Sequence, residues 1–134
     1  MSTAERMLRA HPEEPGHVER GLIAACVERC LVCAQACTAC ADACLFEERV
    51  AELRVCVRTD LDCADVCEAT ARVLSRGAVG GPVRRAAVEA CAAMCRACAD
   101  ECRRHAQAHE HCAVCAEACR SCAQACAELL RALG

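Results

Sequence analysis

The stretch CVERCLVCAQACTACADAC, residues 26–44, decides the fold, because its cysteines recur at alternating gaps of four and three residues. Side chains at that spacing lie on one face of an α-helix, as the a and d positions of a helical bundle do. The same kind of spacing returns in three later segments, and 18 of the 134 residues are cysteine. With one phenylalanine and no Trp or Tyr, the chain has few large side chains for a core. The sequence therefore predicts an all-α bundle lined with thiols.

Turn signals are sparse, and they divide the chain into one short helix and four long ones. Ser2 and Glu5 have the spacing of a capping box, which predicts a short N-terminal helix over about residues 2–10. The segment HPEEPG, residues 11–16, ends this helix, and GAVGGP, residues 77–82, predicts a loop in the middle of the chain. The long helices are expected at about residues 17–45, 49–75, 82–105 and 109–132.

Glycine and proline at the central loop sharpen these boundaries. Gly77 suits the C-terminal cap of the second long helix, and Pro82 suits the first turn of the third. Residues 46–48 form the break between the first two long helices, and a tight turn near Gln107 joins the last two. Because short connections make consecutive helices antiparallel neighbours, we expect an antiparallel four-helix bundle with a short extra N-terminal helix. At this length the whole chain, residues 1–134, is expected to form a single domain.

Every cysteine falls within a predicted long helix, and the gaps within each helix are three, four or seven residues. All the thiols are therefore expected to face the bundle axis. The same pattern adds Asp60 to the thiol line of the second long helix and His105 to that of the third. The cysteines are Cys26, Cys30, Cys33, Cys37, Cys40, Cys44, Cys56, Cys63, Cys67, Cys91, Cys95, Cys98, Cys102, Cys112, Cys115, Cys119, Cys122 and Cys126.

Composition and charge argue against several classes of partner. A net charge of −3 offers no electrostatic attraction to nucleic acid. The sequence has no uninterrupted apolar run of roughly 18 residues that would span a membrane, and its charged N-terminal segment does not resemble a signal peptide. We therefore expect a cytoplasmic protein with reduced thiols, which uses neither nucleic acid nor a membrane as a partner.

Several roles are conceivable for so many thiols. Cysteine packs as a small hydrophobe when buried, but leucine would fill a bundle core better. Disulfides within one helix would be strained, because residues four apart have Cβ atoms about 5–6 Å apart and a disulfide requires about 3.8 Å. A reducing cytosol opposes disulfides between helices. The C-x-x-C motifs, such as CLVC and CTAC, leave a thiol-redox or iron–sulfur protein as an alternative, although most of them lie in mid-helix.

Charge favours the storage of a soft monovalent metal. Thiolates bind metal, so a filled core would bury up to 18 negative charges, which is very costly without compensation. A few zinc ions would leave a large deficit of positive charge, whereas one monovalent ion per thiolate brings the interior near neutrality. Soft thiolate ligands select Cu(I). We therefore expect Cu(I) storage at roughly one ion per cysteine, with a general zinc, cadmium or silver sink as the closer alternative.

The spacing also suggests how each ion is held. Cysteine pairs four residues apart, such as Cys26 with Cys30 and Cys115 with Cys119, place two sulfurs on one helical face. Rotamer choice can bring such sulfurs to about 4.6 Å, which suits a metal with bonds near 2.3 Å. Each helix is therefore expected to hold ions largely by itself, with neighbouring helices supplying a third ligand.

The chain closely resembles the bacterial cytosolic copper storage proteins. The resemblance is carried by the cysteine-lined helices, by CADAC at residues 40–44 and by DLDCADVCEATARVLSR at residues 60–76, and it covers almost the whole chain. It implies a homotetramer of four-helix bundles in which each chain stores many Cu(I) ions without catalytic turnover. We expect copper to arrive and leave on a copper chaperone or a small-thiol carrier.

Antiparallel topology assigns residues to two ends of the bundle. We name the first end the histidine mouth, because three of the five histidines gather there beside thiols; its residues are Cys44, Phe46, His105, His109, His111 and Cys112. The second end is the apolar plug, with Leu22, Ile23, Leu74, Val88, Leu129 and Leu133. Imidazole is a weaker ligand than thiolate for soft copper, which suits an entrance that passes ions inward. His105, His109 and His111 are therefore candidate metal ligands.

Asp60 is a further candidate metal ligand. A buried carboxylate needs a partner, and Asp60 is expected to hydrogen-bond a histidine, accept a thiol proton or contact copper. Its helix runs away from the histidine mouth, so it should lie roughly three turns in from that end.

Overall fold

In the computed structural model, residues 1–14, 18, 20–77 and 81–133 are described, and within them the chain forms helices and no β-strand. A short 3-10 helix, η1, lies between the second and third α-helices. The elements in chain order are α1 (Thr3–Ala10), α2 (Arg20–Leu45), η1 (Val50–Leu53), α3 (Arg54–Leu74), α4 (Gly81–Arg103) and α5 (Glu110–Leu133).

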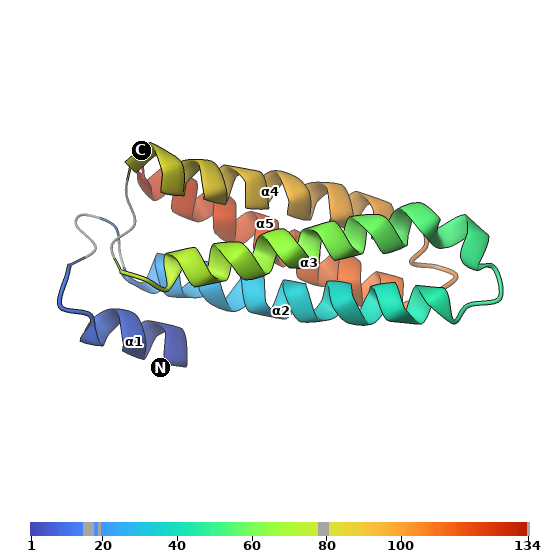
Figure 1. Ribbon diagram of the computed structural model, residues 1–134, viewed down its shortest axis with the longest axis horizontal. Coiled ribbons are helices and arrows are strands. Elements are labelled where there is room, and N and C mark those ends of the chain that lie inside the picture. The colour runs from blue at the N-terminus through green and yellow to red at the C-terminus, as the bar shows by residue number, and fades with distance from the viewer. Residues whose placement is uncertain (15–17, 19, 78–80, 134) are drawn as a thin grey trace.

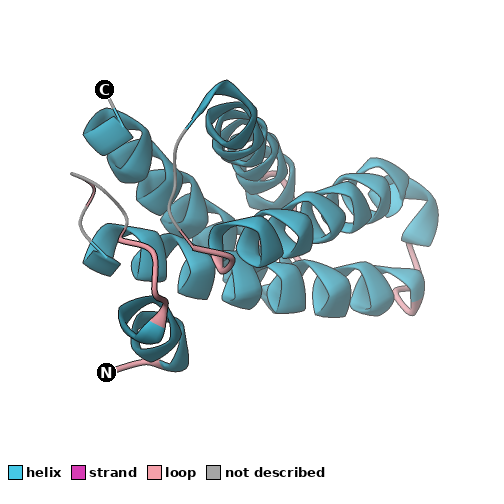
Figure 2. Cartoon of the chain, turned by 60° about the vertical axis from the view of Figure 1, so that its left-hand side comes forward, coloured by secondary structure: helices cyan, strands magenta, loops and turns pink. Residues whose placement is uncertain are grey.

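The four long helices form an antiparallel bundle. They lie side by side along the long axis of the molecule, with the α2–α3 and α4–α5 connections at one end and the end of α3 and the start of α4 at the other (Figure 1). α2 packs against α3 and α5, and α4 packs against the same two helices, so α2 and α4 face each other diagonally across the core. α1 lies outside this group against α2 (Figure 2). The predicted four-helix bundle with a short extra helix is confirmed.

The N-terminal helix begins where the capping box predicts. The Ser2 side chain accepts a hydrogen bond from the Glu5 backbone N–H at 3.1 Å, which satisfies one of the free donors of the first turn. Leu8 is the buried residue of this helix. The predicted turn at residues 11–16 and the predicted helix start at His17 lie partly outside the described residues.

Two predicted helix boundaries differ from the structure, one by five residues and one by two. The second long helix is predicted from about Arg49, but residues 50–53 form η1, and α3 begins only at Arg54. The tighter 3-10 turn brings Leu53 into the core, where it is 1% exposed. The third long helix is predicted to reach about His105, but α4 ends at Arg103, where the chain tightens into i to i+3 bonds, including His105 N–H to the Cys102 carbonyl at 3.0 Å.

Gly77 has a different role from the predicted helix cap. α3 ends at Leu74 with Ser75 as its cap residue, so Gly77 lies beyond the cap. Its φ of +110° belongs to the region that favours glycine, and a Cβ at this position would come within 2.9 Å of the His11 ring. The glycine therefore allows the segment after α1 to approach the end of α3. The rest of the predicted 77–82 loop lies largely outside the described residues.

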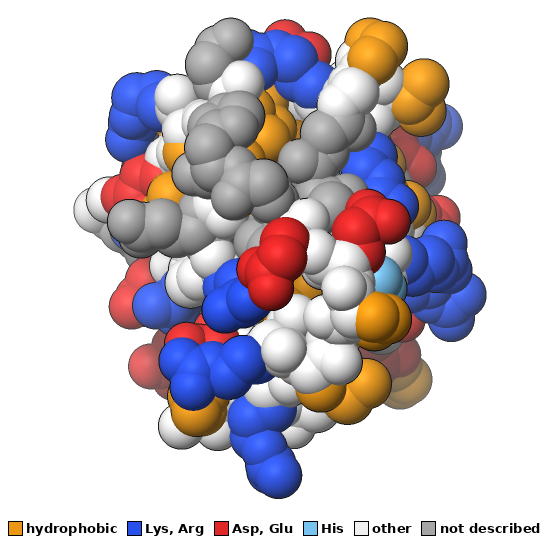
Figure 3. Space-filling model, turned by 90° about the vertical axis from the view of Figure 1, so that its left-hand side faces the viewer, with side chains coloured by type: hydrophobic (Ala, Val, Ile, Leu, Met, Phe, Trp, Pro, Cys, Tyr) orange, Lys and Arg blue, Asp and Glu red, His pale blue; other side chains and the backbone are white. Residues whose placement is uncertain are grey.

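The apolar plug forms as predicted at the end where α3 finishes and α4 begins. Four of its side chains, Ile23, Leu74, Val88 and Leu129, are 0% exposed, while Leu22 and Leu133 are partly buried against the same core. Each long helix contributes one of the four. The outer surface of this end carries arginine and acidic side chains around a few hydrophobic ones (Figure 3).

α2 is apolar beyond the face that it turns to the core. By length and composition it is the one helix in the described part of the chain that could cross a membrane, although the core helix of a bundle passes the same test. Its cysteines and Ile23 are fully buried, yet Leu31 and Val32 are about half exposed. A helix that is apolar on both faces normally has partners on both.

Candidate metal-binding core

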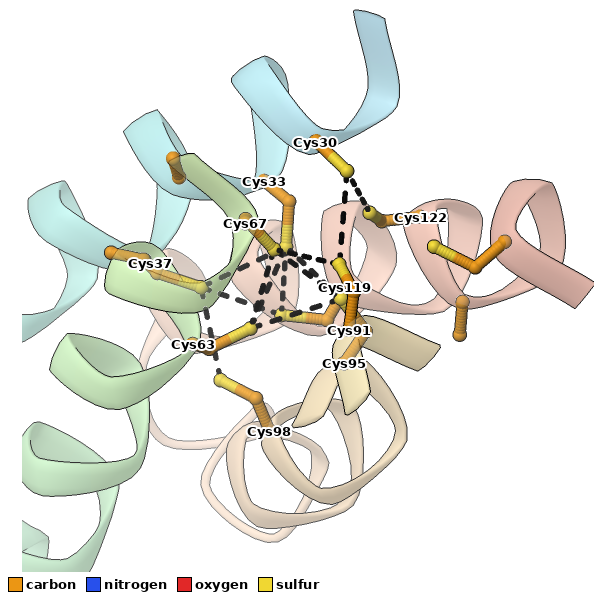
Figure 4. Packing of buried hydrophobic residues seen from close by; sticks show 14 of the residues in the cluster. Cys30, Cys33, Cys37, Cys63, Cys67, Cys91, Cys95, Cys98, Cys119 and Cys122 are labelled. Carbon is orange, nitrogen blue, oxygen red and sulfur yellow. Dashed lines mark hydrogen bonds between the residues drawn. The ribbon is translucent and has the colours of Figure 1, made fainter. Parts of the chain in front are cut away.

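All 18 cysteines are free thiols, and each side chain is 0% exposed. The prediction that every thiol faces the bundle axis is therefore confirmed. The thiols of α2, α3, α4 and α5 converge along the axis, so that Cys33 of α2 lies among sulfurs of the other three helices (Figure 4). The result is a rod of sulfur atoms inside the bundle.

The sulfur atoms lie close together both within and between helices. Within single helices, the Cys33–Cys37, Cys63–Cys67 and Cys115–Cys119 Sγ atoms are each 3.9 Å apart. Sulfurs on different helices approach as closely or more closely, as in Cys67–Cys95 at 3.4 Å and Cys37–Cys119 at 3.5 Å. The expectation that each helix holds ions largely by itself therefore understates the contribution of neighbouring helices.

Groups of four sulfurs lie within 4.8 Å of one another, and these groups overlap. They include Cys30, Cys67, Cys91 and Cys122; Cys33, Cys37, Cys63 and Cys119; Cys33, Cys67, Cys95 and Cys122; and Cys37, Cys98, Cys115 and Cys119. Cys33, for example, belongs to two of them. A thiolate shared by two groups would bridge two ions, so the geometry suits a connected chain of metal ions better than separate tetrahedral sites.

Asp60 lies at the centre of a cluster of thiols and is 0% exposed. Its Oδ1 accepts hydrogen bonds from the thiols of Cys98 at 3.1 Å and of Cys102 and Cys115 at 3.3 Å. Burial first, and then the neighbouring Cys115 and Cys56, raise the pKa of Asp60 to about 8. The partners of Asp60 are thus thiols, one of the alternatives considered above, and Asp60 lies about two turns into α3, with η1 between that helix and the connection from α2.

Burial also determines the protonation state of the thiols nearest the histidine mouth. Removal from water raises the pKa of Cys44 to about 11 and raises that of Cys112 as well. Both groups are therefore neutral thiols near pH 7 in the metal-free protein. A metal ion that binds them must displace their protons.

Of the three histidines at the mouth, His111 contacts the thiols. Its Nδ1 lies 3.3 Å from Cys40 Sγ and 3.6 Å from Cys112 Sγ. Cys40, Cys44, Cys112 and His111 form a further group of four candidate ligands within 4.8 Å. This group joins the mouth to the end of the sulfur rod.

The other two histidines contact carboxylates. His105 Nε2 lies 2.9 Å from Glu101 Oε2, and His109 Nδ1 lies 3.1 Å from Glu47 Oε2. Glu101 is four residues before His105, so helical spacing alone would have predicted that pair. No sequence spacing predicts the Glu47–His109 pair, because this contact joins the α2–η1 connection to the residues just before α5. Phe46, which was placed at this mouth, is 85% exposed and points to solvent.

Comparison with known proteins identifies relatives of the same architecture. The family model described as Csp, copper storage protein, matches residues 20–131. A copper storage protein, Ccsp, from Streptomyces lividans, loaded with 10 copper equivalents, is 62% identical, with a TM-score of 0.93 over 98% of this chain and 100% of that one. The comparison with curated proteins yields no match.

Two further structures extend the likeness. A cytosolic copper storage protein from Streptomyces lividans with five coppers is 66% identical, with a TM-score of 0.81 over 85% of this chain and 96% of that one. The Cu(I)-bound copper storage protein BsCsp3 is 36% identical, with a TM-score of 0.70 over 79% of this chain and 95% of that one. By the match of the family model over all four long helices, the chain belongs to the copper storage protein family.

Proposed function

We propose that this protein stores and sequesters many Cu(I) ions in the cytoplasm, without catalytic turnover. The observation that carries the proposal is the continuous set of overlapping four-sulfur groups along the bundle axis. Relatives loaded with ten and five coppers support the same reading. Copper retained after anaerobic loading and gel filtration, measured per chain, tests it directly.

Monovalent copper suits this core better than zinc, cadmium or an iron–sulfur cluster. Shared thiolates such as Cys33 and Cys37 belong to more than one group, and bridging lets each sulfur serve two ions. Cu(I) accepts two or three sulfurs and brings one positive charge for each thiolate, which keeps the interior near neutrality. Silver, the other soft monovalent ion, is expected to bind by the same rule.

The proposed ligands are the 18 cysteines together with the three mouth histidines and Asp60. His111 would coordinate through Nδ1, beside Cys40 and Cys112. His105 and His109, which contact Glu101 and Glu47, would hold an ion only in passage. A copper chaperone or a small-thiol carrier would deliver copper to this mouth.

Asp60 is proposed to prepare its thiol cluster for copper. Its Oδ1 accepts hydrogen bonds from Cys98, Cys102 and Cys115, which holds these three sulfurs around one point. A pKa of about 8 leaves Asp60 largely protonated near pH 7, so when an ion replaces the thiol protons Asp60 can release its own proton and become a carboxylate beside the ion. The same oxygen is then close enough to contact the ion.

The triple replacement of His105, His109 and His111 with alanine tests the proposed entrance. All 18 thiols remain, so the final Cu(I) capacity should fall by about an ion or two. The rate of loading from a carrier should fall more, because an arriving ion no longer meets imidazoles that hold it while it leaves its carrier. Stopped-flow loading from a Cu(I)–chelator complex measures this rate. An unchanged rate would place the entrance elsewhere.

The exposed apolar face of α2 supports self-association, which the resemblance to the cytosolic copper storage proteins would make a homotetramer. Leu31, Val32 and Val114 of α5 are each more than half exposed, and Val32 and Val114 line one shallow groove between α2 and α5. Because α2 is apolar beyond its core face, we propose that a second copy of the chain covers this surface. The chain itself would act as one domain, with α1 attached to α2 through Leu8.

Light scattering after size-exclusion chromatography tests this association. The parent protein should have four times the mass of one chain, whereas a variant with Val32→Asp and Val114→Asp should dissociate, because two buried carboxylates would remain without partners. Val83→Asp is the matched control, since Val83 is 81% exposed and lies on α4. A parent protein that elutes as a single chain would refute the tetramer.

A further inference from the structure

A single carboxylate oxygen at the histidine mouth contacts two imidazoles. Glu47 Oε2 lies 2.8 Å from His111 Nε2 and 3.1 Å from His109 Nδ1. The two rings are stacked, with centroids 5.4 Å apart and planes inclined by 23°. Glu47 therefore contacts Nε2 of His111 but Nδ1 of His109.

The charge of Glu47 determines which nitrogens carry protons. A glutamate carboxyl is ordinarily ionised at neutral pH, and Glu47 lies against both imidazoles through one oxygen. An ionised carboxylate only accepts hydrogen bonds. His111 therefore donates through Nε2–H, and a proton on His109 Nδ1 avoids placing the lone pair of that nitrogen 3.1 Å from the charged oxygen.

We propose that Glu47 is a positioning residue that holds His109 and His111 in opposite neutral tautomers. His109 would carry its proton on Nδ1 and keep a lone pair on Nε2. His111 would carry its proton on Nε2 and direct the lone pair of Nδ1 at Cys40 and Cys112, which lie 3.3 Å and 3.6 Å away. The two nitrogens free to bind metal are then Nε2 of His109 and Nδ1 of His111, on adjacent rings.

This arrangement bears on copper transfer and rests on the proposed storage function. A carboxylate that binds the far nitrogen of a histidine fixes its orientation and raises its basicity as a ligand. Nδ1 of His111 would thereby complete the group formed by Cys40, Cys44 and Cys112. His109, stacked on His111, would present the neighbouring ligand for an ion on its way to that group.

Long-range proton–nitrogen NMR of the metal-free protein tests the tautomers without copper. At mildly alkaline pH, where imidazole is neutral, His109 should give the Nδ1–H pattern, which is the less common form of free histidine, and His111 the Nε2–H pattern. In Glu47→Ala both histidines should lose this preference. In Glu47→Gln, whose amide oxygen can take the place of Oε2 but carries no charge, the preference of both histidines should weaken. Glu48→Ala, which removes an exposed carboxylate next to Glu47 in the chain, should leave both patterns unchanged.

Copper binding supplies the second readout. In Glu47→Ala, the affinity of the mouth group for Cu(I) should fall by about 10- to 100-fold, as is typical when the partner of a ligating histidine is lost. In a His111→Ala background the same substitution should cost no further affinity, because Glu47 acts through His111. The proposal is overturned if His109 has the Nε2–H pattern in the parent, or if Glu47→Ala leaves both tautomers as they were. A parent protein that binds little or no copper would instead refute the storage function, and the tautomer result would still stand.

Discussion

Replacing Asp60 with asparagine should make the metal-free protein more stable at neutral and alkaline pH. Burial raises the pKa of Asp60 from 3.8 to about 8, so between these values the folded protein holds a proton that the unfolded chain has released. The unfolding free energy of the parent must therefore fall as pH rises through this window, by at most about 1.4 kcal/mol per pH unit. Asparagine has no proton to lose, and its oxygen can still accept from Cys98, Cys102 and Cys115.

Chemical denaturation of reduced, metal-free protein at several pH values measures this difference. The gap between Asp60→Asn and the parent should widen from about pH 4 to about pH 8 and then remain constant, reaching several kcal/mol. Asp62→Asn is the matched control, because Asp62 is exposed and lies on the same helix. Parallel pH profiles for the parent and Asp60→Asn would show that the buried carboxyl group is ionised at neutral pH.

Replacing Leu129 with alanine should destabilise the protein without changing its copper capacity. Leu129 is 0% exposed in the apolar plug and offers no ligand atom. The loss of a buried leucine costs about 2–5 kcal/mol, because it removes apolar contacts and leaves a cavity. Thermal or urea denaturation measures this cost, and Leu61→Ala, at a site that is 47% exposed, is the control with little expected effect.

The same variant also tests which end of the bundle admits copper. If the histidine mouth is the entrance, Leu129→Ala should exchange copper at nearly the parent rate. Much faster exchange by Leu129→Ala, together with a parent rate for the triple-histidine variant, would place the entrance at the apolar plug.

The bundle and its thiol core were predictable from sequence because helical periodicity is a local property. Gaps of three and four residues around Cys33 and Cys119 place each sulfur on one face of its own helix whatever the neighbours do. The same periodicity placed Asp60 among the thiols. The apolar plug followed from antiparallel topology, which brings Ile23 and Leu129 to one end.

The features that sequence did not reveal depend on contacts between distant segments. Glu47 approaches His111 only because the α2–η1 connection and the start of α5 meet at one end of the bundle. The close approach of Cys67 to Cys95 depends on the rotation and separation of two helices, which a one-dimensional pattern does not define. The 3-10 turn before Arg54 likewise reflects the burial of Leu53, a tertiary effect that overrides local helix preference.

The Cu(I) capacity of the chain tests the central claim most directly. Reduced protein is titrated anaerobically with Cu(I) in the presence of a competing chelator, and the ions bound per chain are counted at saturation. Because charge neutrality in the buried core requires roughly one monovalent ion for each thiolate, we predict saturation at about 15–20 ions per chain. Saturation near four or five ions would contradict the account, because it would mean separate tetrahedral sites in place of a connected Cu(I)–thiolate core.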